Sequence, residues 1–184
     1  MGLAGHRHAL AALAVVAFVE SSIFPIPPDV LLIPMVLASP TRAWRIALVC
    51  TAASVAGGLA GYGIGLFLFE TVGRPLIEFY SATDAFGQFQ AAYAEWGAWI
   101  VGGAGLTPFP YKVITILSGV MELDITVFTV TSAASRGLRF FAEAALLWHF
   151  GQPIRAFIEG HLGLLTTVFF ALLIGGFALM QFIL

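Results

Sequence analysis

Residues Glu20–Asp29 read ESSIFPIPPD, and this proline-rich stretch decides how the chain folds. It interrupts an apolar run that begins at Ala9 and resumes from Val30 to Ser39. A second apolar run, from Gly97 to Met121, is interrupted in the same way by PFPYK at residues 108–112. Because proline lacks a backbone donor and ends helices, each cluster predicts a turn between two short helices.

The composition indicates a membrane protein. The 184 residues are 60% hydrophobic and 10% charged, whereas a soluble domain has about 45–50% apolar and about 25% charged residues. So few charges cannot cover a soluble surface, which argues against a cytosolic enzyme, a disordered linker or a nucleic-acid partner. With Cys50 as the single cysteine and no His/Asp/Glu cluster at metal-site spacing, we expect no disulfide, metal or cofactor.

The apolar runs predict an all-α polytopic membrane protein. A spanning helix needs about 20 apolar residues, and three segments are long enough: Ile46–Phe69, Ile125–Phe150 and Leu162–Leu184. The proline-broken runs, residues 9–39 and 97–121, are predicted to be re-entrant helical hairpins, because irregular backbone at membrane depth must be buried in protein or line a wet cavity. Residues 70–96 would connect them, within a single domain over residues 1–184.

The two proline clusters also match as an internal repeat. An offset of 83 residues places Pro25 on Pro108 and Pro27 on Pro110, and Pro28 completes the first hairpin tip. Paired Pro-interrupted apolar segments in the two halves of a chain point to a transporter-like binding site. One crossing separates the two hairpins, so they would enter from opposite faces, and the repeat would be inverted.

Charge placement predicts the orientation of this arrangement. One face would hold four basic residues, Arg7, Arg42, Arg45 and Arg155, with Glu159 as its acid. The other face would hold Arg74 and six acids, Glu70, Glu78, Asp84, Glu95, Glu122 and Asp124. The positive-inside rule places the first face in the cytoplasm, with a cytoplasmic N-terminus and a periplasmic C-terminus.

Six ionisable residues fall at membrane depth: Glu20, Asp29, Lys112, Arg136, Arg139 and Glu143. Each would cost about 2.5–3.5 kcal/mol if it faced lipid unpaired. Steps of three and four residues place Arg136, Arg139 and Glu143 on one stripe of a helix, which we expect to face the hairpin tips. The three carboxylates are then candidates for proton coupling and the three cations for binding a lipid headgroup. The alternative is an ion-pair lattice that only locks the bundle.

Small residues recur every fourth position in the first full-length span. Gly57, Gly61 and Gly65 form a small-xxx-small ridge. Such ridges favour close packing between membrane helices, and we expect that role here rather than one in lining a substrate path.

Three motifs resemble the DedA superfamily of SNARE-associated, or VTT-domain, membrane proteins, most closely its YqaA-like branch. They are ESSIFPIPPD at residues 20–29, TPFPYKVITILSG at 107–119 and SRGLRFF at 135–141, and the resemblance extends over nearly the whole chain. It implies a bacterial inner-membrane protein with two re-entrant hairpins in inverted repeats. It also implies a transporter or lipid flippase that depends on the proton-motive force, with polyprenyl phosphate carriers and phosphatidylethanolamine as substrates.

The second hairpin departs from the pattern of this superfamily. Many members carry an arginine directly after the glycine, where Leu106 here follows Gly105, and Lys112 stands where they have a later arginine. Lysine lacks the bidentate fork of arginine, so its phosphate geometry would differ. Arg136 and Arg139 would then supply the missing contacts.

We therefore expect a proton-coupled carrier or flippase for an anionic lipid headgroup, with membrane lipids and protons as partners. The alternatives are a proton-coupled transporter of a small cation or drug, and a non-transport membrane assembly or homeostasis factor. An enzyme is not expected, because the sequence has no His-Glu-x-x-His or Gly-x-Ser-x-Gly motif and no evident nucleophile beside a base. Assembly into a homo-oligomer stays open.

Overall fold

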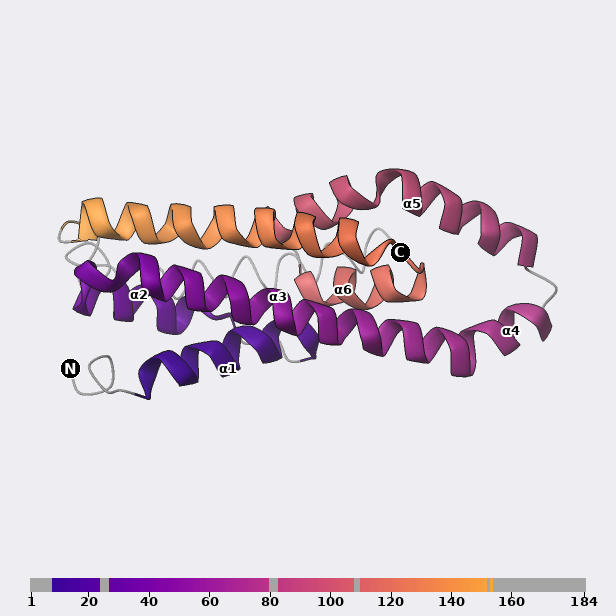
Figure 1. Ribbon diagram of the computed structural model, residues 1–184, viewed down its shortest axis with the longest axis horizontal. Coiled ribbons are helices and arrows are strands. Elements are labelled where there is room, and N and C mark those ends of the chain that lie inside the picture. The colour runs from indigo at the N-terminus through magenta and orange to yellow at the C-terminus, as the bar shows by residue number, and fades with distance from the viewer. Residues whose placement is uncertain (1–7, 24–26, 80–82, 108–109, 152, 154–184) are drawn as a thin grey trace, which may run out of the picture. The chain divides into compact units, whose positions relative to one another are not determined.

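The computed structural model describes residues 8–23, 27–79, 83–107, 110–151 and 153 (Figure 1). These residues are helical and include no strand, so the predicted all-α class is confirmed. The chain divides into two compact units, residues 1–148 and 149–184. The description below concerns the first unit, and the predicted span Leu162–Leu184 lies outside the described residues.

The first proline cluster separates two short helices, α1 (Ala9–Ser22) and α2 (Asp29–Ala38). Pro28 precedes α2 with φ −65°, the angle that its ring imposes and that a helical start requires. At the end of α1, the Ser22 hydroxyl donates to the Phe18 carbonyl, and Ile23 leaves helical geometry. The two helices therefore end and begin where the proline pattern predicts a turn.

The longest helix is α3 (Ala43–Leu68), which follows a 3₁₀ turn over Pro40–Arg42. The continuous helical stretch Pro40–Phe79 is long and apolar enough to cross a membrane, and it is the single such helix among the described residues. The sequence predicted two further spans. One lies outside the described residues, and in the helix over residues 125–151 the charges of Arg136, Arg139 and Glu143 lower the mean hydropathy.

The segment expected to connect the two hairpins is itself largely helical. A π-helical turn over Phe69–Gly73 leads into α4 (Arg74–Phe79), and α5 (Thr83–Leu106) begins well before the predicted start of the second hairpin at residue 97. Alanines in this segment favour a helix, and proline is absent from α5.

After the second proline cluster, α6 (Tyr111–Val120) is followed by a tight turn. Glu122 takes a positive φ of 53° in this turn. The Asp124 carboxylate then accepts hydrogen bonds from the backbone N–H groups of Thr126 and Val127, both at 2.9 Å. This side-chain cap fixes the start of the helix over residues 125–151.

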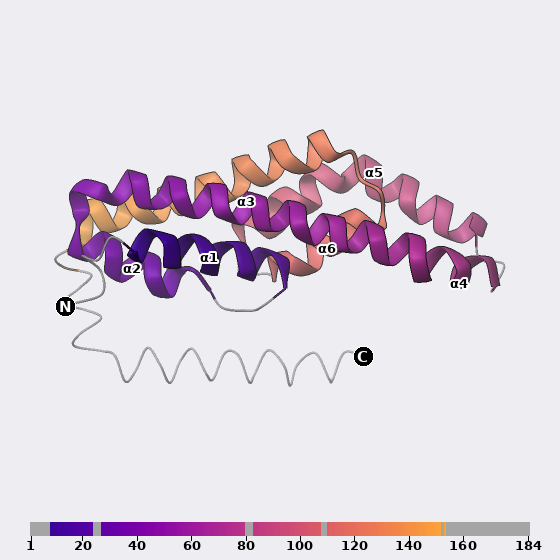
Figure 2. The same ribbon diagram turned by 60° about the horizontal axis from the view of Figure 1, so that its bottom comes forward.

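Helix α3 lies at the centre of the unit, with α1 and α6 packed along it (Figures 1 and 2). Glycines permit this close approach. A Cβ atom on Gly57 would overlap the backbone of Phe18 in α1, and one on Gly65 would overlap the Ile116 carbonyl in α6. Reciprocally, a Cβ atom on Gly119 of α6 would overlap the Tyr62 carbonyl of α3. Backbone contact at these glycines thus sets how near α1 and α6 lie to α3.

Candidate functional site

A buried arginine joins four helices of the first unit. Arg136, on the helix over residues 125–151, is 2% exposed. Its Nε donates to the Ser54 hydroxyl of α3 at 2.7 Å, and its Nη2 forms an ion pair with Glu20 Oε2 of α1 at 2.8 Å. The guanidinium carbon lies 4.8 Å from the ring centroid of Tyr111 in α6 and 4.7 Å from that of Phe140. We call Glu20 and Arg136 the inner pair.

Hydroxyl groups complete the hydrogen bonding around the inner pair. Ser21 Oγ donates to Glu20 Oε2 at 3.0 Å and lies 2.7 Å from Ser54 Oγ. The Tyr111 hydroxyl donates to Ser132, one turn before Arg136 on the same helix. A buried ion pair is stable only when its remaining donors and acceptors are satisfied, and these serines and Tyr111 serve that purpose. The inner pair is therefore a closed, ordered network.

A second ion pair lies nearer the surface. Arg139 Nη2 contacts Asp29 Oδ2, at the start of α2, at 2.8 Å, and the two side chains are 27% and 23% exposed. Arg139 Nη1 also donates to the Thr107 carbonyl, at the end of α5, at 3.3 Å. We call Asp29 and Arg139 the outer pair, and it brings the two proline-broken segments to the same helix.

The outer pair is less completely satisfied than the inner pair. Asp29 Oδ1 is buried and has no hydrogen-bond partner among the described residues. The Glu143 carboxyl, one turn after Arg139, lies within hydrogen-bonding reach of the Asp29 carboxyl. The buried Cys50 of α3 is close enough to interact electrostatically with both carboxyls.

Lys112 lies apart from both ion pairs. Its Nζ donates to the Ile23 carbonyl at 3.3 Å, so it links the start of α6 to the end of α1. Among the described residues it forms no ion pair. Its ammonium group is therefore the least committed cation of the predicted set.

The structure thus brings five of the six predicted ionisable residues into two adjoining clusters and leaves Lys112 beside them. Of the predicted hairpin-tip prolines, Pro27, Pro28 and Pro110 flank the helix starts, while Pro25 and Pro108 lie outside the described residues. Gly57, Gly61 and Gly65 lie on the faces of α3 that meet α1 and α6. Among the described residues, no group of three His, Cys, Asp or Glu could hold a metal ion.

Several contact residues were not singled out from the sequence. Ser54 precedes Gly57 and Gly61 at helical spacing, so its place on the packed face of α3 could have been inferred from that spacing. Phe140 follows Arg136 by four residues, the spacing of a same-face helix pair. Tyr111 is adjacent to Lys112 in PFPYK, but which neighbour faces the interior depends on how α6 packs.

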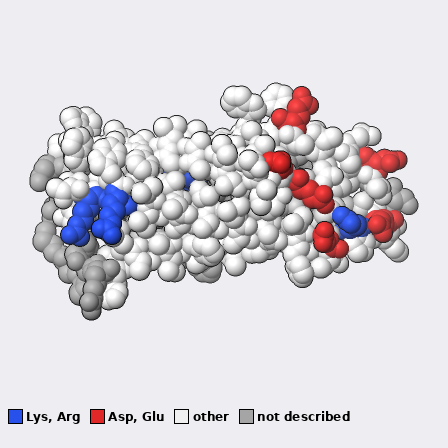
Figure 3. All heavy atoms as spheres, viewed as in Figure 1, with Lys and Arg blue, Asp and Glu red and all other residues white. Residues whose placement is uncertain are grey.

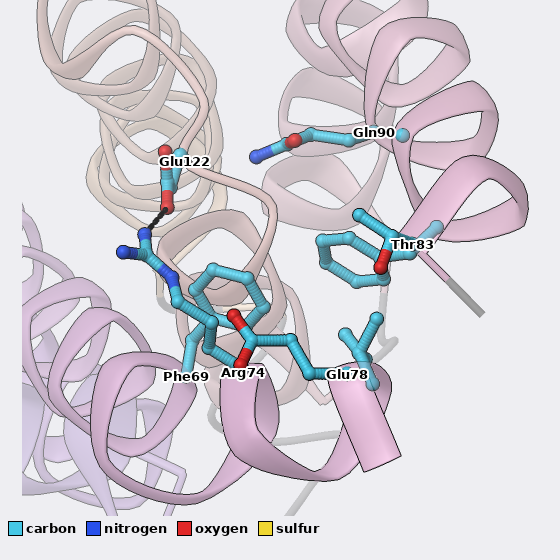
Figure 4. Close-up of a pocket in the computed structure, with 9 residues that line it drawn as sticks. Phe69, Arg74, Glu78, Thr83, Gln90 and Glu122 are labelled. Carbon is cyan, nitrogen blue, oxygen red and sulfur yellow. Dashed lines mark ion pairs between the residues drawn. The ribbon is translucent and has the colours of Figure 1, made fainter. Parts of the chain in front are cut away.

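A separate pocket lies at the far end of α3 (Figure 4). It has a volume of about 280 Å³, and its lining includes Phe69, Arg74, Glu78 and Glu122. Arg74 pairs with Glu122 at 3.6 Å, and both side chains are well exposed. The charges of this pocket are thus weakly held compared with those of the inner pair.

Comparison with known proteins identifies two relatives. A Haemophilus influenzae protein described as an uncharacterized protein is 36% identical over 151 residues, covering 82% of this chain and 78% of its own length. The HI0703 homolog of Histophilus somni, also described as uncharacterized, is 39% identical over 156 residues, covering 85% of this chain and 81% of its own. No family model and no solved structure matches the chain. The chain belongs to the family of these Haemophilus influenzae and Histophilus somni proteins.

Proposed function

We propose that this protein is an integral membrane transporter or flippase that moves an anionic lipid headgroup and is coupled to protons. The observation that carries the proposal is the pair of adjoining arginine–carboxylate contacts between proline-broken segments and one charged helix. Ionisable residues held among apolar helices are expensive, and in membrane proteins they mark substrate or proton pathways. Unlike a purely structural lattice, this site contains one arginine that is fully bound and one that is partly accessible.

The exposed surface supports a membrane environment. Large apolar side chains on α1, α3 and the helix over residues 125–151 are more than half exposed, among them Val15, Leu48, Val130 and Leu138. Figure 3 shows basic groups at the end where α3 begins, acidic groups at the opposite end, and between them a band almost without charge. Helix α3 has 26 residues and is about 39 Å long, enough for a hydrocarbon core of about 30 Å.

The same charge asymmetry supports the proposed orientation. Arg42 and Arg45 stand at the start of α3, and Glu70 and Glu78 follow its other end. The positive-inside rule then places the start of α3 in the cytoplasm of a bacterium, with the protein in the inner membrane. The acidic end and its pocket would face the periplasm.

The geometry distinguishes the roles of the three cations. Arg136 is enclosed by two aromatic rings and has donors directed at Ser54 and Glu20, so we assign it a positioning role. Arg139 is partly exposed, and Lys112 donates only to a carbonyl among the described groups. We therefore propose that Arg139 and Lys112 contact the phosphate of the headgroup, with charge-assisted hydrogen bonds that are strong in a site of low dielectric.

The resemblance to the DedA superfamily supports the same proposal, with a polyprenyl phosphate or a phospholipid as the cargo. The two alternatives differ in their requirements. A transporter of small cations would use the carboxylates and lose nothing when Lys112 is neutralised. An assembly factor would tolerate neutralisation of Arg139 as long as the fold survives.

The test is a flipping assay in liposomes of phosphatidylethanolamine and phosphatidylglycerol that contain a fluorescent phosphatidylglycerol. Chemical quenching from outside measures how fast the labelled headgroup crosses under an imposed pH gradient. We expect Arg139→Gln and Lys112→Gln each to slow crossing at least about tenfold, which corresponds to about 1.4 kcal/mol. Arg74→Gln, which breaks an exposed pair at the other end, is the matched control and should retain the original rate.

Two results would contradict the proposal. Crossing at the rate of protein-free liposomes would exclude flipping of this phospholipid, and the assay is then repeated with a labelled polyprenyl phosphate. Equal rates for the unmodified protein and both cation variants would exclude the headgroup roles of Arg139 and Lys112.

A further inference from the structure

The outer pair contains an unmatched oxygen that the inner pair lacks. Asp29 Oδ1 is the one buried side-chain oxygen or nitrogen atom without a hydrogen-bond partner in the described part of the chain. Its sister oxygen Oδ2 is bound by Arg139. Buried acceptors are nearly always satisfied, so an unpaired carboxylate oxygen indicates a missing donor.

The group beside this oxygen is another carboxyl. Glu143 lies within hydrogen-bonding reach of Asp29. Two ionised carboxylates only accept hydrogen bonds and repel each other, whereas a protonated carboxyl can donate to an ionised one. One proton between Asp29 and Glu143 would therefore supply the missing donor and remove the repulsion.

The charges around the two carboxyls give the same result. Arg139 on the same helix is the cation that contacts Asp29, and Cys50 faces both carboxyls from α3. Arg136 and Glu20 also act on Cys50, but they neutralise each other in the inner pair. With both carboxylates ionised, the cluster of Asp29, Glu143 and Arg139 has a net charge of about −1, and one bound proton makes it neutral. A neutral cluster is the state that an apolar surrounding favours.

We propose that Asp29 and Glu143 share a single proton at neutral pH and that this carboxyl pair, rather than Glu20, takes up and releases the coupling proton. Uptake converts two carboxylates into one carboxylate and one carboxyl. Release restores both carboxylates, which then hold Arg139 more tightly and withdraw it from the headgroup. The assignment of the proton to coupling rests on the proposed function, whereas the shared proton itself does not.

Glu20 is the natural control because its environment is closed. Its Oε2 already accepts from both Ser21 and Arg136, and it is removed from the Asp29–Glu143 pair in the hydrogen-bond network. Glutamine at position 143 has the same length as glutamate, and its amide N–H can donate to Asp29 as the proton would. Glu143→Gln therefore preserves the geometry of the protonated pair.

The experiment is infrared spectroscopy of the full chain in phosphatidylethanolamine–phosphatidylglycerol nanodiscs across a pH titration. We expect the unmodified protein to show the carbonyl-stretch band of a protonated carboxyl at neutral pH and to lose it at alkaline pH. Glu143→Gln and Asp29→Asn should each abolish the neutral-pH band, and Glu20→Gln should retain it. Absence of the band from the unmodified protein, or its survival in both outer-pair variants, would overturn the shared proton.

The flipping assay separates this inference from the proposed function. If the band behaves as expected but no labelled lipid crosses, the shared proton stands and the transport proposal fails. If lipid crosses and its rate keeps the original pH dependence in Glu143→Gln, the transport proposal stands and the coupling role of the pair fails. We expect the rate in Glu143→Gln to become nearly independent of pH, while Glu20→Gln keeps the pH dependence of the unmodified protein.

Discussion

At the scale of single residues, Arg136 and Arg139 stand one turn apart on one helix and yet have different environments. Arg136 is buried between two aromatic rings, with its donors bound to Ser54 and Glu20. Arg139 is about ten times more exposed by side chain and shares its carboxylate partner with Glu143. Neighbouring arginines of one motif thus divide into a fixed group and an adjustable one.

The inner pair should be essential for stability. Arg136→Gln leaves Glu20 buried without its cation, and breaking a buried pair in this way costs about 3–5 kcal/mol. We therefore expect a large drop in the thermal unfolding midpoint of the purified protein in detergent. Arg74→Gln, which breaks an exposed pair, should change the free energy of unfolding by less than about 1 kcal/mol.

Replacing both members of the inner pair tests whether the charges themselves are needed. Glu20→Leu combined with Arg136→Met removes both charges and keeps apolar volume, and such exchanges are often neutral or stabilising by about 1–4 kcal/mol. We expect the double variant to unfold at a higher temperature than Arg136→Gln. A midpoint as low as that of Arg136→Gln would show that the network around Ser54 and Tyr111 matters more than the unpaired charge.

At the scale of helices, close packing rests on where glycine occurs in α3. A Cβ atom at Gly57 or Gly65 would meet backbone of a neighbouring helix, whereas one at Gly63 would meet nothing within 4 Å. Gly57→Ala and Gly65→Ala should therefore destabilise by about 1–3 kcal/mol through overpacking. Gly63→Ala, the same substitution on the same helix, should be neutral or stabilising by up to about 1 kcal/mol, because alanine favours helix.

Thermal unfolding of the three glycine variants provides the measurement. Equal midpoints for Gly57→Ala and Gly63→Ala would contradict the role of backbone contact between α1 and α3. This comparison needs no assumption about transport, since all three variants change one hydrogen to a methyl group.

Local rules predict the elements of this chain better than their contacts. The all-helical class and the turns at both proline clusters follow from residue type, because proline cannot continue a helix. Helical spacing places Arg136, Arg139 and Glu143 on one side of their helix. Which carboxylate pairs with which arginine depends on how α1 and α2 dock against that helix, and spacing within one helix contains no such information. The early start of α5 escaped prediction because its charges and apolar residues alternate weakly.

At the scale of the whole described unit, the separation of charge along α3 predicts sidedness in a membrane. In a Cys50→Ala background, single cysteines at Arg42 and Asp84 would report the two ends. We expect a membrane-impermeant maleimide to label Asp84→Cys in intact spheroplasts and Arg42→Cys only after permeabilisation. Labelling of both from the outside, or of Arg42→Cys alone, would contradict the proposed orientation.

The inner pair also has a consequence for biosynthesis. Glu20 and Arg136 are 116 positions apart in the chain, so a ribosome adding about 5–20 residues per second finishes Arg136 many seconds after Glu20. During that interval the first hairpin carries a carboxylate whose partner does not yet exist. The early part of the nascent chain must therefore wait in a wet or chaperoned environment, and its final seat among the helices is closed only by the arrival of the later one.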